Sequence, residues 1–306
     1  MKILKNILFL LFGLSVIFTS CTDIVDVEIN DEDLDLYIVE AMLNTKDSNN
    51  VYVRLSKTVK VTDDVANPAV SDAEIYIKDL DNTSFADTLV ETSVQGLYML
   101  KPGKEYKPIV GHNYELKIIT PEGVTITAEE HLMEVPNLDS VQVWKSLRGD
   151  LEFFAVFISS EEPAGVGNFY KWDIYVNGSL LHLAENMAFA DDGDVDGNYV
   201  YELEIFTDFH DPSDDPLLSI GDTVVVEQNS ISKTGYDFYL GMVNQAFSGG
   251  PFSVPPANLP TNLVASNGKR VIGMFTAQDV SRGNAVIITE ANDAPKPDNS
   301  KTKSER

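Results

Sequence analysis

The sequence contains very little cysteine and few basic residues. Cys21 is the only cysteine among 306 residues, which excludes an intramolecular disulfide and a zinc site built from several cysteines. Lysine and arginine number 22 against 48 acidic residues, so the formal net charge is −26. Such an acidic surface repels phosphate backbones and anionic headgroups, so we expect no nucleic-acid partner and no charge-driven adsorption to membranes.

The chain also lacks an apolar run long enough to cross a bilayer, which takes roughly twenty residues in a helix. Its first apolar run, Ile7 to Ile17, is shorter and is interrupted by one glycine and one serine. Lys2 and Lys5 precede this run and make a basic start. Together these features predict a signal peptide over residues 1–20.

The residues at the end of this segment resemble the bacterial lipobox, in which small residues precede a cysteine that is lipidated. They read Phe18-Thr19-Ser20-Cys21, with Phe18 where leucine is commonest. We therefore expect Cys21 to carry the lipid that holds the protein to a membrane; the alternative is an ordinary secretory signal followed by a stray cysteine. Residues 21–35 are strongly acidic and predict a solvated tether, either a plain linker or a surface-export signal.

Motifs for hydrolytic chemistry are missing as well. The four histidines show no H-E-x-x-H spacing, and there is no G-x-S-x-G elbow. Glu129 with His131, and Glu161 with Glu162, are the only pairs that suggest acid–base work, and each is more simply a solvated strand edge or turn. We expect no enzymatic activity.

Residues 36–135 alternate between apolar and polar positions, which predicts half-buried strands. The alternation is clear at Val53 and Leu55, at Ile75 and Ile77, and again along 114–118 and 124–128. Turn-forming residues separate these runs. The pattern favours an immunoglobulin-like antiparallel sandwich.

Residues 136–289 predict a second antiparallel β-domain, a sandwich or an open barrel, after a joint at Val135-Pro136-Asn137. Leu151 to Ile158 is apolar on both faces, as in a strand covered on both sides. Asn177-Gly178 predicts a hairpin turn. One amphipathic helix is expected over 232–247, with Ser232 as its N-cap. Its apolar face is expected to consist of Tyr236, Tyr239, Leu240, Val243 and Phe247. Residues 290–306 are expected to be a disordered tail.

Two groups of side chains suggest binding. Asp192, Asp194 and Asp196 match the first half of a D-x-D-x-D-G calcium loop, although the twelfth position is Leu203 and not glutamate. These carboxylates are either weak Ca²⁺ ligands or a solvated acidic turn. Tyr170 and Trp172 share a strand face, where they either stack on sugar rings or, as the apolar neighbours favour, belong to the core.

Several separated stretches resemble a family of Bacteroidetes outer-membrane lipoproteins called domain of unknown function four-two-four-nine. The stretches are Tyr37-Ile38-Val39-Glu40-Ala41, Val70 to Ile75, Val135 to Val141, Ile231 to Tyr236, Pro251-Phe252, Thr261-Asn262-Leu263 and Gly273-Met274-Phe275. Members of this family are often encoded beside TonB-dependent receptors. The resemblance therefore implies an outer-membrane location, at the cell surface or on the periplasmic face, and an accessory role in nutrient uptake. The resemblance implies no catalytic activity and no catalytic residues.

Two functions remain open at this point. The first is a non-catalytic lipoprotein that helps a TonB-dependent receptor to bind a nutrient, and the second is a surface-displayed hydrolase or glycan-binding protein. The proline-rich loop from Pro251 to Pro260 is the expected receptor contact, with Phe252 as its aromatic anchor. The alternative is that Phe252 packs over the end of the helix.

Overall fold

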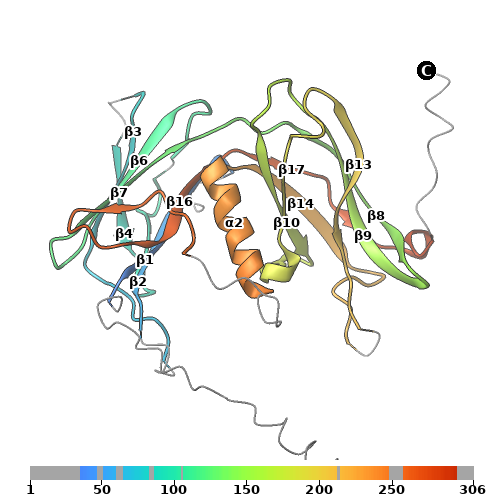
Figure 1. The fold of residues 1–306 in the computed structure, drawn as a ribbon, viewed down its shortest axis with the longest axis horizontal. Coiled ribbons are helices and arrows are strands. Elements are labelled where there is room, and N and C mark those ends of the chain that lie inside the picture. The colour runs from blue at the N-terminus through green and yellow to red at the C-terminus, as the bar shows by residue number, and fades with distance from the viewer. Residues whose placement is uncertain are drawn as a thin grey trace, which may run out of the picture. The chain divides into compact units, whose positions relative to one another are not determined.

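The computed structural model describes residues 35–46, 51–59, 65–82, 86–104, 106–211, 214–247 and 258–294. The chain is mainly β, with large antiparallel sheets and one α-helix among these residues, as predicted (Figure 1). The largest sheet has nine strands in the order β15-β7-β6-β3-β4-β5-β2-β1-β16. In chain order these are β1 (Tyr37–Asn44), β2 (Tyr52–Lys57), β3 (Glu74–Asp79), β4 (Ala86–Glu91), β5 (Leu97–Leu100), β6 (Asn113–Ile119), β7 (Thr125–His131), β15 (Val264–Ala265) and β16 (Ile272–Gln278).

The nine-stranded sheet buries the apolar positions that the period-two pattern singled out. Val53, Leu55, Ile75 and Ile77 are at most 1% exposed and belong to one hydrophobic cluster. The polar residues between them face the other side of the sheet, because successive side chains of a strand point in opposite directions. The predicted strands of residues 36–135 are therefore confirmed.

Two strands of this sheet, β15 and β16, come from the range in which the second domain was expected. β16 pairs with β1 in parallel, with Val39 opposite Gly273. Asn262 joins β16 to β7, because its side chain accepts from Phe275 N at 3.1 Å and donates to Phe275 O and to Glu130 Oε2, both at 2.8 Å. This side chain links β16, at one end of the sheet order, to β7, which is next to the other end.

The remaining strands form two smaller sheets. One has three strands in the order β13-β9-β8, and the other follows β11-β10-β14-β17, with β12 added on β10 and β18 on β14. Their bounds are β8 (Leu138–Arg148), β9 (Leu151–Glu161), β10 (Phe169–Val176), β11 (Ser179–Leu180), β12 (Ala188–Asp191), β13 (Tyr199–Thr207), β14 (Thr223–Ser230), β17 (Val280–Arg282) and β18 (Val286–Ile287).

The sequence predicted the central features of these sheets. In β9, residues 153–160 are buried on both faces, as expected for a strand covered on both sides, whereas Leu151, the first residue of the predicted strand, is 46% exposed. Asn177 and Gly178 have φ values of 51° and 83° and connect β10 to β11, which confirms the hairpin. The second strand of that hairpin, β11, has two residues.

Asp279 connects the nine-stranded sheet to the sheet of β10 and β14. It lies between β16 and β17, and its carboxylate accepts from Thr45 Oγ1 at 2.7 Å and from Val135 N at 3.0 Å. Its backbone exchanges hydrogen bonds with Ser230. One aspartate thus joins the end of β1, the joint near residue 135 and the end of β14.

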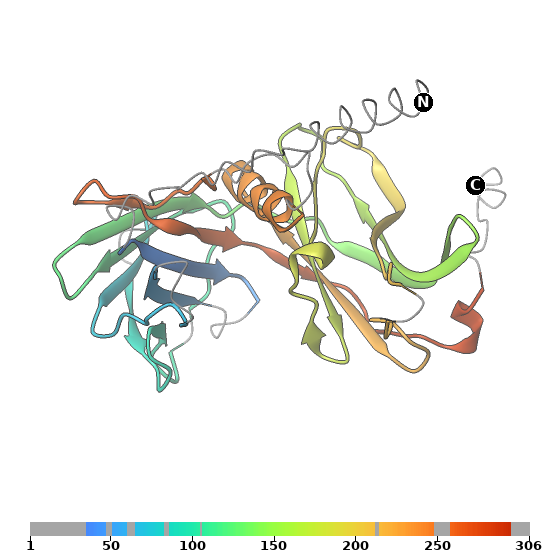
Figure 2. The same cartoon turned by 60° about the horizontal axis from the view of Figure 1, so that its bottom comes forward.

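The helix α2 (Lys233–Ala246) begins after Ser232, whose side chain accepts from Gly235 N at 3.1 Å. This confirms the predicted helix and its N-cap. Figures 1 and 2 show α2 between β16 and β10, against the place where the two sheets meet.

The described part of the predicted tail is folded. Glu290–Asn292 form a 3₁₀ turn, η4, and Asn292 Nδ2 donates to Val143 O at 2.8 Å. The same side chain accepts from Thr289 N at 2.8 Å. An amide side chain that satisfies two backbone groups keeps this segment against β8, which the polar composition did not indicate.

Candidate functional site

Two predicted site residues lie outside the described residues. They are Cys21, the expected lipid attachment point, and Phe252, the expected receptor contact. Both stay predictions.

The acidic loop that was expected to bind calcium is held by hydrogen bonds within the protein. Asp192 is 1% exposed, and its carboxylate accepts from Gly167 N at 2.9 Å and from Asn168 N at 3.1 Å. Asp196 Oδ1 accepts from Gly165 N at 2.6 Å, whereas Asp194 is exposed. Calcium binding stays a prediction, and these carboxylates already fix the neighbouring loop.

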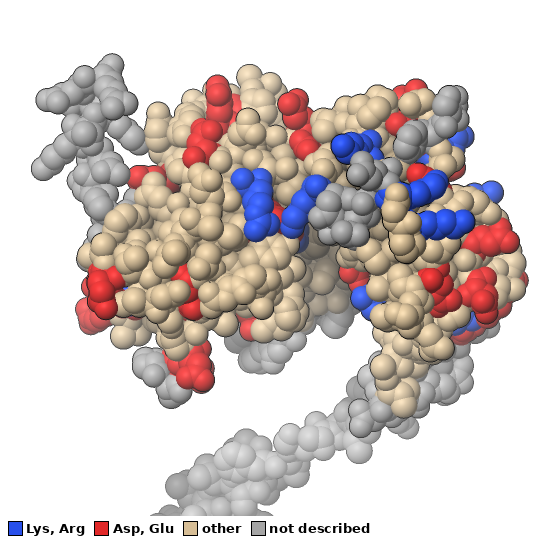
Figure 3. Space-filling model, turned by 180° about the vertical axis from the view of Figure 1, so that it is seen from behind, with Lys and Arg blue, Asp and Glu red and all other residues tan. Residues whose placement is uncertain are grey.

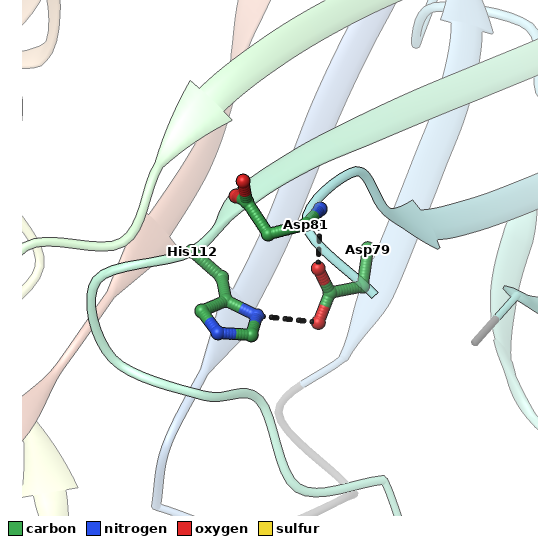
Figure 4. Close-up of side chains that lie close together, drawn as sticks. All are labelled: Asp79, Asp81 and His112. Carbon is green, nitrogen blue, oxygen red and sulfur yellow. Dashed lines mark hydrogen bonds and ion pairs between the residues drawn. The ribbon is translucent and has the colours of Figure 1, made fainter. Parts of the chain in front are cut away.

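A second acidic group, Asp79, Asp81 and His112, has potential metal ligands within 4.8 Å of one another. Figure 4 shows the Asp79 carboxylate between the His112 ring and the backbone nitrogen of Asp81, with both contacts at 2.9 Å. The Asp81 carboxylate accepts from Asn113 N at 2.7 Å. These bonds tie the end of β3 to the start of β6, so we interpret the group as a structural pairing.

The aromatic residues that suggested a sugar platform are part of the core. Tyr170 and Trp172 are each 6% exposed. Tyr170 Oη donates to Glu162 Oε1, and Trp172 Nε1 donates to Gln228 Oε1, both at 2.8 Å. The core interpretation is confirmed, and burial raises the pKa of Glu162, the member of the predicted carboxylate pair that is not exposed.

The strongest candidate for a functional site is a partly open cavity of about 470 Å³ lined by residues of α2, β1, β16 and β10. This volume lies in the range of small-molecule sites, roughly 300 to 1,000 Å³. Most of its lining is apolar. The apolar side chains come from Ile38, Met42, Leu180, Leu181, Met187, Phe238, Met242, Leu259, Ile272 and Met274.

The strand period explains how these side chains come to face the cavity. In β1, Val39 and Ala41 point into the core of the nine-stranded sheet, so Ile38 and Met42 point the other way. In β10, Trp172 belongs to the core on one side, so Lys171 and Asp173 face the cavity. The cavity therefore lies between the outer faces of two sheets whose inner faces hold separate cores.

Helix α2 covers one side of this space. Tyr236 contacts the rings of Phe169 and Phe189, with centroid distances of 5.3 and 5.4 Å. Tyr239, one turn later, lines the cavity, and its ring centroid lies 6.4 Å from that of Phe189. The helix is incompletely covered, because Leu240, on the face predicted to be apolar, is 39% exposed.

The polar side chains that line the cavity include an ion pair on β10. Lys171 and Asp173 are in direct contact, and their side chains are 14% and 16% exposed. Burial lowers the pKa of Lys171, but Asp173 and Tyr239 raise it by more, so its pKa lies above the usual value and the ammonium stays charged. Asn229 Nδ2 donates to Asp173 Oδ2 at 3.1 Å. The Lys171 ammonium also lies 5.5 Å from the Tyr239 ring centre.

A carboxyl group next to the start of α2 is also unusual. Glu130 is 9% exposed, and burial raises its pKa to about 7 despite hydrogen bonds from Ser232 and Asn262. Asn262 Nδ2 donates to it at 2.8 Å. Glu130 is not among the residues that line the cavity, and its bonds connect β7 to the helix start.

The sequence did not predict this cavity, although the residue pattern of one of its walls can be read from the sequence. The alternation along 169–176 places Lys171 and Asp173 on the face opposite to Trp172. That pattern indicates a polar face. It does not indicate that a helix more than fifty residues later covers the face, because periodicity identifies faces and not partners.

Charges of both signs are spread over the face shown in Figure 3. Acidic side chains form several separate groups there, and basic side chains lie among them. Within the described residues, no helix is both long and apolar enough to cross a membrane.

A protein family matches most of the chain. The family described as Domain of unknown function (DUF4249) matches residues 22–284, which confirms the resemblance found in the separated stretches. No curated protein matches the chain.

Proposed function

Because the chain belongs to the DUF4249 family, whose match begins directly after Cys21, we propose that it is a lipid-anchored lipoprotein of the outer membrane that binds a small molecule. It acts without catalysis, as an accessory to a TonB-dependent receptor in nutrient uptake. The lipobox-like residues before Cys21 support the anchor.

The cavity between α2 and strands β1, β10 and β16 is the observation that carries the binding role. Its walls are mostly apolar, and its buried charges, Lys171 and Asp173, are paired with each other. Paired charges make a poor nucleophile or base, since each stabilises the ionised form of the other. An apolar cavity with a few fixed polar groups is typical of a ligand site.

Titration with N-phenyl-1-naphthylamine, a neutral apolar fluorophore, tests this binding role. We expect saturable fluorescence enhancement with the wild-type chain. Met242→Trp and Ile38→Trp fill the cavity from opposite walls and should each reduce binding at least about tenfold. Val166→Trp, at a position 76% exposed and outside the cavity lining, is the matched control.

The outcome separates cavity binding from surface adsorption. Loss of enhancement in both cavity variants, with unchanged melting temperatures and a normal control, supports the proposal. Equal binding by all four proteins places the fluorophore elsewhere and rejects it.

The partner is proposed separately, since it depends on the Pro251 to Pro260 loop. Crosslinking in native membranes followed by purification should recover a TonB-dependent receptor, and Phe252→Ala should reduce its yield without lowering the melting temperature. Recovery of no outer-membrane receptor rejects the partnership. A sharp fall in melting temperature shows instead that Phe252 is a packing residue.

A further inference from the structure

Methionine is concentrated around the cavity. Met42, Met187, Met242 and Met274 line it, and the whole chain has only seven methionines. They come from β1, from the turn before β12, from α2 and from β16. Methionine side chains are unbranched and polarizable, so they adapt to apolar ligands of irregular or variable shape. This lining favours a flexible hydrocarbon over a rigid polar molecule.

The polar wall restricts the charge of the ligand. Lys171 and Asp173 are each less than one-fifth exposed and neutralise each other. Asp173 also accepts from Asn229, so its second oxygen has a partner as well. A carboxylate in the cavity would compete with Asp173 for the ammonium and leave one buried anion without a cation. An ammonium ligand would compete with Lys171 for the Asp173 carboxylate and leave one buried cation without an anion. Burying an unpaired charge costs several kcal/mol, so both ligand classes are disfavoured.

Other charged groups at the cavity add little selection. Glu40 lines it, and its carboxylate accepts from Tyr52 Oη at 2.8 Å and lies 3.7 Å from Arg54 Nε. The side chains of Glu40 and Arg54 are 61% and 54% exposed. Water screens such charges strongly, so they contribute little to affinity.

From the adaptable apolar walls and the neutral ion pair, we propose that the cavity binds an uncharged amphiphile: a flexible hydrocarbon that ends in a hydroxyl or amide. The hydrocarbon lies against the four methionines. Its polar end donates to Asp173 or accepts from Lys171, and the existing ion pair stays intact. This inference rests on the proposed binding role and specifies the class of ligand.

Competition against N-phenyl-1-naphthylamine tests the ligand class with three probes of equal chain length. They are 1-dodecanol, used below its solubility limit, and dodecanoate and dodecylammonium, each used below the concentration at which it forms micelles. With the wild-type chain we expect 1-dodecanol to bind at least about tenfold more tightly than either ion, because only the ions disturb the buried pair.

Variants of the pair then test its role directly. Asp173→Asn leaves Lys171 without its carboxylate, and dodecanoate should become the preferred probe. Lys171→Met leaves Asp173 without its ammonium, and dodecylammonium should become the preferred probe. Lys233→Met, which removes an exposed ammonium on the first turn of α2, is the control and should keep the wild-type order.

If either variant does not fold, the ranking of the three probes by their affinity for the wild-type chain still tests the inference. A preference for dodecanoate or dodecylammonium in the wild-type chain overturns the inference while leaving the binding role intact. If the naphthylamine fluorophore itself does not bind the cavity, the proposed function fails first. Equal affinity for all three probes also overturns the inference, since the ion pair then selects nothing.

Discussion

Glu130 is a buried carboxyl that lies where β7, the start of α2 and the 261–263 segment meet. Its pKa is raised to about 7 from 4.5, mainly by burial, although Ser232 and Asn262 donate to it. Between these two pH values the folded chain holds a proton that the unfolded chain has released. The contribution of Glu130 to the free energy of unfolding is therefore highest below about pH 4.5. This contribution is lost as the pH rises through 7.

The first prediction concerns the pH dependence that Glu130 causes. Its shift corresponds to a loss of about 3 kcal/mol of unfolding free energy between pH 4.5 and pH 8. Glu130→Gln keeps an acceptor for Asn262 but cannot ionise. We expect urea denaturation to show this variant losing about 3 kcal/mol less than the wild type over that range.

Glu129→Gln is the matched control, because Glu129 is the exposed neighbour on the same strand. It should keep the pH dependence of the wild type. If Glu130→Gln follows the wild-type curve at both pH values, Glu130 is already ionised in the folded chain and its environment is more polar than we describe.

Among the elements, the parallel pair of β1 and β16 depends on one glycine. Gly273 has a φ of 101°, and a Cβ at this position would lie 2.0 Å from Val39 O and 2.9 Å from Val39 C. Both atoms are backbone, so no side chain can move aside. The close approach of these two strands, which form one wall of the cavity, therefore requires glycine.

The second prediction compares Gly273 with a glycine that also has a positive φ but has no atom close to its Cβ position. Gly268 has a φ of 73°, but nothing lies within 4 Å of its Cβ position. We expect Gly268→Ala to cost about 1 kcal/mol of unfolding free energy through strain, and Gly273→Ala to cost at least about 3 kcal/mol through strain and overlap. Urea denaturation of the two variants measures both costs. Equal costs would show that β16 can shift away from β1.

The strands show how far the sequence predicts the fold. Period-two alternation identified the buried faces of β2 and β3, because a half-buried sheet requires it. The partner of each strand was not predictable, since alternation is the same for any neighbour. The parallel pairing of β1 with β16 joins segments more than two hundred residues apart, and nothing local in either strand indicates it.

The candidate site was predictable only in part, for a related reason. The helix was readable from its N-cap and its spacing, and β10 from its alternation. The cavity forms where these elements meet β1 and β16, so it depends on tertiary packing. The acidic 192–196 loop stood out in the sequence, yet its carboxylates of Asp192 and Asp196 bond to the 165–168 backbone. Local motifs showed where acidic residues gather and not what they contact.

For the molecule as a whole, the third prediction concerns attachment to the membrane. Cys21→Ser should remove the lipid, so the chain should move from the membrane to the soluble fraction. Cell fractionation followed by immunoblotting measures this, and labelling with a radioactive fatty acid should be lost in the same variant. Retention of Cys21→Ser in washed membranes would mean that the lipid on Cys21 is not what holds the chain there.

The central claim, that the cavity holds an uncharged amphiphile, is tested most directly through its own methionines. Labelling the methionine methyl groups with ¹³C gives a separate nuclear magnetic resonance signal for each methionine, and titration with 1-dodecanol reports which methyl groups the ligand contacts. Met42, Met187, Met242 and Met274 line the cavity, whereas Met99 and Met133 do not. We predict that the signals of the first four shift with a common saturation curve while those of Met99 and Met133 stay unchanged. Unchanged signals for the four cavity methionines, at dodecanol concentrations that displace the fluorophore, would contradict the account.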